Sequence, residues 1–261
     1  MSYSVPINDR GLLLADGLFE TILVKQGEPI LWQAHVDRLA AGCVTLGLPT
    51  PDPAVLLEAA FKALHEADLG QARAALRLTW TAGSGGRGLD RPDPLQPRLI
   101  AQVALAPVAS GPARLALAAI RRNESSPTSR LKTLAYLDNI LARREARAEG
   151  ADEALMLNTQ DDIAGCAAAN IFWIERDRLL TPALECGALD GIVRGEVLKV
   201  AAGVGLTPEE VCTSLEALAE AKTAFITSSL VGVRPVTWLD GRTLESDERV
   251  AALQARLAEV S

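Results

Sequence analysis

The first 106 residues carry an apolar pattern that switches between strand and helix. Apolar residues at positions 36, 39, 43 and 46 recur at spacings of three and four, which places them on one face of a helix. A turn signal at Gln26, Gly27 and Glu28 separates two shorter apolar runs. The pattern predicts strands over 18–25 and 29–32, helices over 33–46 and 53–67, and strands over 74–81 and 98–105 that flank a glycine-rich loop, 82–88.

A segment with two prolines and a glycine, residues 107–112, separates this pattern from the rest of the chain. Such a composition is typical of a linker, so we expect a smaller N-terminal domain over 1–106 and a larger C-terminal domain over 113–261. The second domain should hold strands over 115–120, 153–158, 170–174, 224–227 and 231–236, and helices over 134–149, 191–202 and 246–260. Because strands and helices mix without regular strand–helix–strand alternation, we expect an α+β fold.

Two of the predicted helices carry specific expectations. The helix over 134–149 should bury one apolar face, formed by Leu134, Leu137, Leu141 and Ala148. The helix over 191–202 should begin after Asp190, because an aspartate side chain before a helix commonly accepts a hydrogen bond from the first free backbone amides.

Composition narrows the class of partner. The chain has 261 residues, of which 49% are hydrophobic and 23% charged, as in ordinary globular proteins. Its net charge of -7 opposes nucleic acid binding, so we expect a small-molecule partner or a second copy of the chain. Four scattered cysteines and two histidines offer no local metal-ligand spacing. No signal peptide and no bilayer-spanning apolar stretch is visible, which predicts a cytoplasmic protein.

Lys132 is the first candidate for chemistry, because Leu131 and Leu134 lie close to it in the sequence. Apolar surroundings make a charged amine costly, so the pKa of the amine falls and the neutral form can act as a nucleophile or a base. A lysine beside leucines also fits a surface residue whose stem lies over an apolar patch. The segment alone leaves both interpretations open.

Three further features point to an anion. Gly191 stands at a predicted helix start, where free backbone N–H groups and the helix dipole attract negative charge. Ser229 offers a hydroxyl after a predicted strand, and Arg38 can make a bidentate contact with a phosphate. Each feature alone also fits a cap, a turn or a solvated face. The loop over 82–88 lacks P-loop spacing, so it is either a flexible hairpin loop or a support from which Arg87 reaches an anionic substrate.

The order and spacing of these motifs resemble the class IV pyridoxal phosphate (PLP) enzymes. This family includes branched-chain aminotransferases, D-amino acid transaminases and aminodeoxychorismate lyases. The resemblance covers nearly the whole chain, and it is carried by residues 10–21, 35–39, 131–134, 168–173, 191–194 and 227–236. It implies the two-domain architecture called fold type IV and a homodimer that holds PLP between the domains.

The resemblance also implies a role for each motif. Lys132 would form the imine bond with the PLP aldehyde and carry the proton of the substrate. Asn170 lies in the motif that resembles the strand beside the cofactor ring. The phosphate would be held by Arg38, the backbone amides of Ile192 and Val193, and the hydroxyl of Ser229.

One departure from the family pattern concerns the cofactor ring. Gly165 stands where the family carries the glutamate that keeps the pyridine nitrogen protonated, and Ala167 replaces a threonine. Without the carboxylate, the ring nitrogen should lose its proton more readily and withdraw electrons less strongly. Asp161 and Asp162 precede this strand, but the alternation of a strand does not aim either side chain at the ring.

Within the family, four motifs look most similar to those of the aminodeoxychorismate lyases, at residues 83–88, 132–137, 168–173 and 229–236. These lyases convert 4-amino-4-deoxychorismate to 4-aminobenzoate and pyruvate. Arg87 would then contact a carboxylate of the substrate. The alternatives are a class IV transaminase that acts on D- or branched-chain amino acids, and a protein that binds PLP with little catalysis because Gly165 replaces the glutamate.

Overall fold

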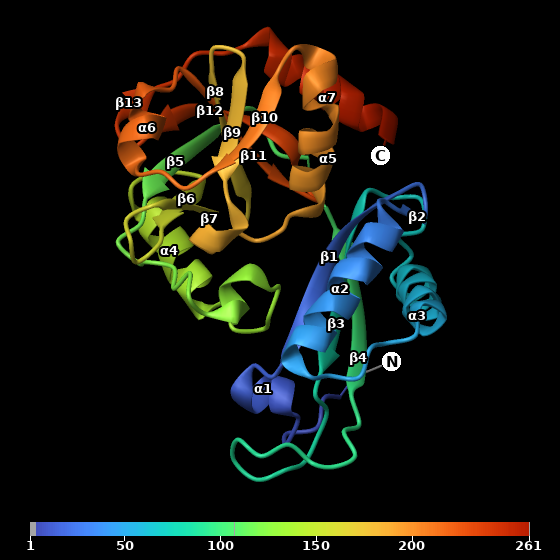
Figure 1. The fold of residues 1–261 in the computed structure, drawn as a ribbon. Helices are drawn as coiled ribbons and strands as arrows, with labels where there is room; N and C mark the ends of the chain where they lie inside the picture. The colour runs from blue at the N-terminus through green and yellow to red at the C-terminus, as the bar shows by residue number, and fades with distance from the viewer. Residues whose placement is uncertain (1–3, 107, 261) are drawn as a thin grey trace. The chain divides into compact units, whose positions relative to one another are not determined.

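The computed structural model describes residues 4–106 and 108–260, which form two compact units (Figure 1). The first unit comprises Met1–Pro107 with Leu131–Ala135, and the second comprises Val108–Arg130 with Tyr136–Ser261. Pro107, part of the predicted linker, lies outside the described residues. Leu131–Ala135 was expected in the C-terminal domain and belongs to the first unit. Residues 108–112 were expected in the linker and belong to the second unit.

The first unit is an antiparallel four-stranded sheet with two helices packed on it. The strand order is β2-β1-β3-β4, and α2 packs on β1 while α3 packs on β3 and β4. Leucine and isoleucine side chains fill the space between the sheet and the helices, among them Ile22, Leu39, Leu56 and Leu76. The elements are α1 (Arg10–Leu14), β1 (Gly17–Lys25), β2 (Glu28–Pro29), α2 (Trp32–Leu46), α3 (Pro53–Glu66), β3 (Ala74–Thr81) and β4 (Arg98–Leu105).

The second unit is built on one mixed sheet of nine strands. Eight strands follow the order β10-β9-β8-β11-β12-β5-β6-β7, and β13 pairs with β12. The strands are β5 (Ala113–Leu117), β6 (Glu153–Leu157), β7 (Ile163–Cys166), β8 (Asn170–Glu175), β9 (Arg178–Pro182), β10 (Thr207–Val211), β11 (Thr223–Ser228), β12 (Gly232–Leu239) and β13 (Arg242–Thr243). The α-helices are α4 (Leu137–Ala148), α5 (Ile192–Val200), α6 (Leu215–Glu220) and α7 (Glu248–Val260), and the short 3-10 helices are η1 (Pro127–Arg130), η2 (Leu184–Cys186) and η3 (Ala201–Val204).

The centre of this sheet is buried on both faces. Successive residues of β8 point to opposite faces, so Trp173 enters one hydrophobic core while its neighbour Phe172 enters another. Phe172 stacks on Phe225 of β11 with ring centroids 5.0 Å apart, in the same core as Val197 of α5 and Leu253 of α7. A buried central strand holds its end residues in place, and the candidate site residue Asn170 begins β8.

The helix expected over 134–149 begins later and buries a different face. α4 starts at Leu137, and Leu137 and Ile140 are 65% and 61% exposed. Its buried side chains are Ala142 and Ala146, which belong to the core that also contains residues of β5 and β6. The predicted leucine face was therefore wrong, because small alanines let the helix approach the sheet more closely than leucines would.

Within residues 4–106 and 108–260, no helix is long and apolar enough to cross a membrane.

Candidate functional site

Lys132 lies in an extended segment beside β1, not at the start of a helix as the sequence suggested. The backbone N–H of Phe19 donates to the carbonyl oxygen of Lys132 at 2.9 Å, and the N–H of Leu134 donates to the carbonyl of Gly17 at 3.0 Å. Leu131 packs against the hydrophobic core of the first unit. These contacts attach the lysine segment to β1, which explains why it belongs to the first unit.

The amine of Lys132 is held where its charged form is disfavoured. The side chain is half-buried, and its Nζ lies 4.2 Å from the centroid of the Phe19 ring. Burial lowers the pKa of Lys132 from 10.5 to about 8, against the opposing field of Glu20 and with the help of Arg38 and Arg77. A sizeable fraction of this amine is therefore neutral near pH 8, and the neutral form is the nucleophile.

Glu20 organises the charges near Lys132. Its carboxylate is buried and accepts hydrogen bonds from His35 Nδ1 at 2.8 Å and from Arg38 Nε and Nη2 at 2.8 and 2.6 Å. Burial raises the pKa of Glu20, but the hydrogen bonds from His35 and Arg38 outweigh it, so the net pKa is lowered. Arg38 is thus held in place by two hydrogen bonds to Glu20, through its Nε and Nη2 atoms.

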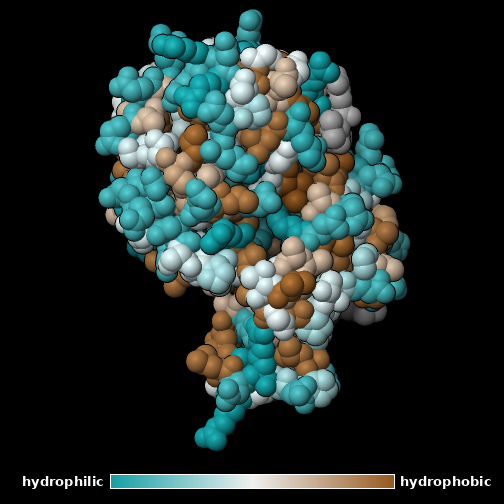
Figure 2. Space-filling view, viewed as in Figure 1, coloured by the Kyte–Doolittle hydropathy of each residue, from teal (hydrophilic) through white to brown (hydrophobic). Residues whose placement is uncertain are grey.

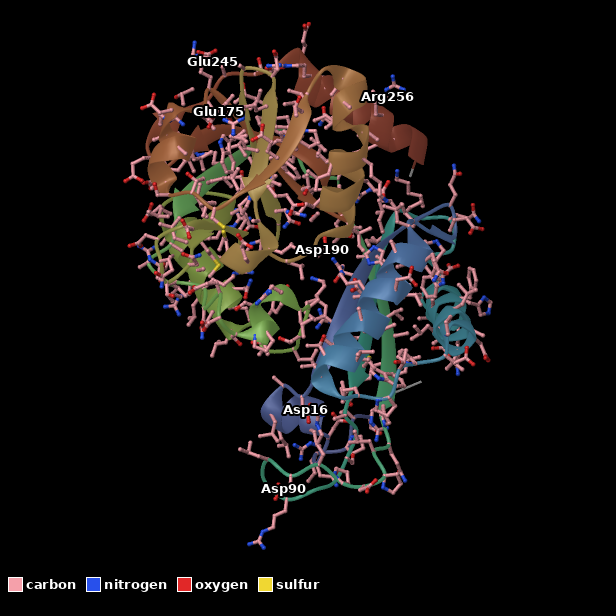
Figure 3. The ribbon with its side chains drawn as sticks, in the orientation of Figure 1. Asp16, Asp90, Glu175, Asp190, Glu245 and Arg256 are labelled. Atoms are coloured by element: carbon pink, nitrogen blue, oxygen red, sulfur yellow. The ribbon has the colours of Figure 1, made fainter. Side chains whose placement is uncertain are left out.

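The glycine-rich loop is shaped by Arg10, whose part in it the sequence analysis missed. The guanidinium of Arg10 donates to the carbonyl oxygens of Gly88, Leu89 and Asp90 at 3.1–3.2 Å, and Asp16 accepts from Arg10 and Arg91 (Figure 3). These hydrogen bonds attach the end of the loop and the residues after it to Arg10. Arg87 is exposed on this loop, and the charges that act on Lys132 are those of other residues.

In the second unit, the amino terminus of α5 offers free backbone donors. Gly191 is the residue before the helix, and no side chain caps the first turn. The prediction that Asp190 caps it was therefore wrong; Figure 3 labels Asp190 in the loop before α5, and its carboxylate lies 3.9 Å from Arg194 Nη1. The amides of Ile192 and Val193 stand in the first turn of a nine-residue helix, where an anion is favoured.

Asn170 holds the loop before α5 in place. Its Nδ2 donates to the carbonyl oxygen of Leu189 at 2.8 Å, and a Cβ added to Gly191 would lie 1.9 Å from its Oδ1. Residue 191 must therefore be glycine for the loop to approach β8 this closely. Asn170 pairs across the sheet with Thr227, whose buried Oγ1 has no hydrogen-bond partner among the described residues. Half-buried Ser229 follows two residues later.

Gly165 lies on β7 and contributes no carboxylate to this unit. The acidic residues just upstream do not replace it: Asp161 forms an ion pair with Arg121 at 3.0 Å, and Asp162 accepts from the Asn158 side chain at 3.4 Å. The departure seen in the sequence therefore persists in the structure.

Each unit by itself offers one part of the chemistry that PLP requires. In the second unit, the buried hydroxyl of Thr227 has no hydrogen-bond partner among the described residues, and the first turn of α5 favours an anion. In the first unit, the amine of Lys132, with its lowered pKa, is suited to an aldehyde. An enzyme that binds PLP is the class of protein that needs both. The family model described as amino-transferase class IV matches residues 17–239. The chain belongs to this family, whose members depend on PLP.

Three individual proteins illustrate the similarity. An aminodeoxychorismate lyase from Bacillus subtilis is 30% identical over 251 residues, which cover 94% of this chain and 86% of the relative. The crystal structure of a 4-amino-4-deoxychorismate lyase from Pseudomonas aeruginosa is 31% identical with a TM-score of 0.90, covering 99% of this chain and 96% of that one. A D-alanine aminotransferase from Listeria monocytogenes is 30% identical over 257 residues, covering 94% of this chain and 86% of the relative.

Proposed function

We propose that this protein is a PLP-dependent lyase that converts 4-amino-4-deoxychorismate to 4-aminobenzoate and pyruvate. The observation that carries the proposal is the Lys132 amine, whose pKa is lowered to about 8 in a chain that matches the lyase from Pseudomonas aeruginosa over nearly its whole length. The motifs at residues 83–88, 132–137, 168–173 and 229–236 also look most similar to those of the aminodeoxychorismate lyases. The substrate is a small anionic molecule, in keeping with the arginines near Lys132.

PLP, when bound, supplies an aldehyde for covalent attachment and a ring that accepts electrons from the substrate. Lys132 would tether it and afterwards move a proton through the same Nζ atom. The phosphate would receive hydrogen bonds from Arg38, from the amides of Ile192 and Val193, and from Ser229. Asn170 would position these amides through its bond to the loop before α5. Arg87 is proposed to contact a carboxylate of the substrate.

The proposal is tested by incubating the purified protein with PLP, reducing with borohydride, and locating the modified peptide by mass spectrometry. Wild type should carry the adduct on Lys132 and release 4-aminobenzoate from 4-amino-4-deoxychorismate without an amino acceptor. Lys132→Ala should lose both the adduct and the product. Lys62→Ala, which changes an exposed lysine of the same unit, is the matched control and should retain both. An adduct that persists in Lys132→Ala would contradict the assignment.

A class IV transaminase is the alternative that the similarity to the Listeria monocytogenes aminotransferase supports. It predicts amino-group transfer from D-alanine or a branched-chain amino acid to a keto acid. Gly165 motivates a second alternative, a protein that binds PLP with little catalysis. Steady release of 4-aminobenzoate at about 1 per second or faster would argue against both alternatives.

We further propose that the chain forms a homodimer in the cytoplasm. α4 exposes Leu137 and Ile140, and α1 exposes Leu12 and Leu13. Figure 2 shows hydrophobic residues, in brown, at several places on the surface in this view. Apolar side chains of this size favour contact with another protein surface. Light scattering should give twice the chain mass for wild type. Ile140→Glu should give a monomer, whereas the control Val55→Glu, at an exposed position of α3, should leave the dimer intact.

A further inference from the structure

The second unit leaves an open space where the family pattern places a carboxylate. Gly165 pairs with Met156 on the neighbouring strand β6, and a Cβ added to Gly165 would meet only the carbonyl oxygen of Ala169, at 3.7 Å. The backbone of Gly165 has a φ of +129°, a conformation that residues other than glycine rarely adopt. The buried Glu153 of β6 does not fill the role, because its carboxylate already accepts from the backbone N–H of Ala154 at 3.0 Å.

Arg122 places its guanidinium beside this open space. Nη2 lies 3.4 Å from the carbonyl oxygen of Cys166 and 3.5 Å from Sδ of Met156, the residue opposite Gly165. Nη1 lies 3.4 Å from the carbonyl oxygen of Gly187. The two contacts with carbonyl oxygens are long for hydrogen bonds, and the thioether sulfur of Met156 is a weak acceptor, so the donors of Arg122 are weakly engaged.

The charge of Arg122 also lacks a close counter-ion. Among residues 4–106 and 108–260, no carboxylate oxygen forms an ion pair with its guanidinium. Burial lowers the pKa of Arg122, although Tyr136, Cys166 and Asp138 act in the opposite direction. A half-buried arginine whose N–H donors are weakly engaged is suited to donate a hydrogen bond to a partner that has a lone pair.

We propose that Arg122 replaces the missing glutamate and donates a hydrogen bond to the unprotonated ring nitrogen of bound PLP. This inference rests on the proposed function, because it requires the cofactor. A nearby cation opposes protonation of the ring nitrogen, and an arginine N–H can donate only to its free lone pair. An unprotonated ring withdraws electrons less strongly, so Arg122 acts as a positioning residue that limits how far the ring can delocalise negative charge.

The experiment compares the binding of PLP with that of 1-deaza-PLP, in which a C–H group replaces the ring nitrogen. Apo-protein is titrated with each compound, and the ratio of the two dissociation constants is the readout, independent of activity. Wild type should bind PLP about tenfold more tightly than the analogue, because only PLP can accept the hydrogen bond. In Arg122→Leu the ratio should fall to within about twofold, whereas the exposed neighbour variant Arg121→Leu should keep the wild-type ratio.

A second measurement needs only the wild-type chain. N-methyl-PLP carries a permanent positive charge on the ring nitrogen, so Arg122 should reject it by at least about tenfold relative to PLP. Equal binding of PLP and its two analogues by wild type would overturn the inference, as would an unchanged ratio in Arg122→Leu. Failure to bind PLP at all would instead defeat the proposed function, and the inference with it.

An independent observation concerns two cysteines that the sequence spacing did not connect. Sγ of Cys186 lies 2.6 Å from Sγ of Cys212, the first thiol buried and the second exposed. The segments that carry them are joined by a backbone hydrogen bond from Ala183 to Val211 at 2.9 Å. The chain between the two cysteines contains α5, whose first turn is assigned to the phosphate.

The geometry points to a reversible disulfide between Cys186 and Cys212 with a peroxide as the oxidant. The two thiols lose two electrons and two protons, one S–S bond forms, and hydrogen peroxide is reduced to two waters. Peptide mass spectrometry after peroxide treatment should show the linked pair, which dithiothreitol should separate. Cys43→Ser should not affect it, because Cys43 lies in the other unit. Recovery of both thiols unmodified, or oxidised without a cross-link, would overturn the assignment.

Discussion

The lowered pKa of Lys132 makes a quantitative prediction for the apo-protein. A shift from 10.5 to about 8 means that the neutral amine at pH 7 is about 300 times more abundant than for an ordinary lysine. The same shift corresponds to a cost of about 3 kcal/mol for holding the charged amine in the folded state. Both consequences follow from burial beside Phe19, with Arg38 and Arg77 adding to it.

The amine can be titrated directly. Brief labelling with trace acetic anhydride between pH 6 and 11, read by mass spectrometry, should give Lys132 a midpoint near pH 8. The exposed Lys62 of the same unit is the internal reference. A Lys132 midpoint near 10.5, its ordinary value, would refute the reasoning, because burial would then have no effect on the charge.

The same shift predicts how stability changes with pH. Below pH 8 the folded and unfolded chains both hold the proton, and the folded chain bears the full cost. Between about pH 8 and 10.5 the unfolded chain binds more protons at Lys132, so stability should rise with pH by up to about 3 kcal/mol. Urea unfolding of wild type and Lys132→Met, compared at each pH, isolates this contribution; parallel curves would contradict it.

Three further changes test other parts of the structure. Glu20→Gln should lower the unfolding free energy measured in urea by about 3 kcal/mol, because it removes the buried carboxylate that lies 2.6 Å from Arg38 Nη2. The pKa of Glu20 is lowered in the folded chain, so wild type should lose this stabilisation as pH falls through that pKa. Gly191→Ala should weaken PLP binding at least about tenfold in titrations, because its Cβ would meet Asn170 Oδ1 at 1.9 Å and displace the loop. Phe172→Ala should cost about 4 kcal/mol of unfolding free energy, because its ring is fully buried.

Much of the secondary structure followed from local spacing. The bounds of β3 and β4 were predicted correctly, and the predicted bounds of α2 and α3 lie within one residue of those in the structure. Strand alternation, helical periodicity and glycine or proline boundaries are local properties, so a sequence displays them directly. The buried face of α4 was not predictable in this way, because leucine and alanine faces both have helical spacing and only the neighbouring sheet selects between them.

Cooperation between distant residues also required the structure. Arg10 orders a loop almost eighty positions away through carbonyl oxygens, which carry no signal in the sequence. The pairing of Arg38 with the two oxygens of Glu20 depends on how α2 packs on β1, which the spacing of the two residues does not display. The closeness of Cys186 to Cys212 depends on how β9 and β10 pair in register.

The family, the candidate lysine and the missing carboxylate at Gly165 could be predicted from the chain alone, because they depend on which residue type stands at which spacing. Three other features required the folded chain: Lys132 lies along β1, its amine is half-buried beside Phe19, and Arg122 lies near Gly165. The physical reason is that pKa values and unsatisfied hydrogen bonds depend on burial and on neighbours brought together by folding, whereas motif spacing is complete in the chain before it folds.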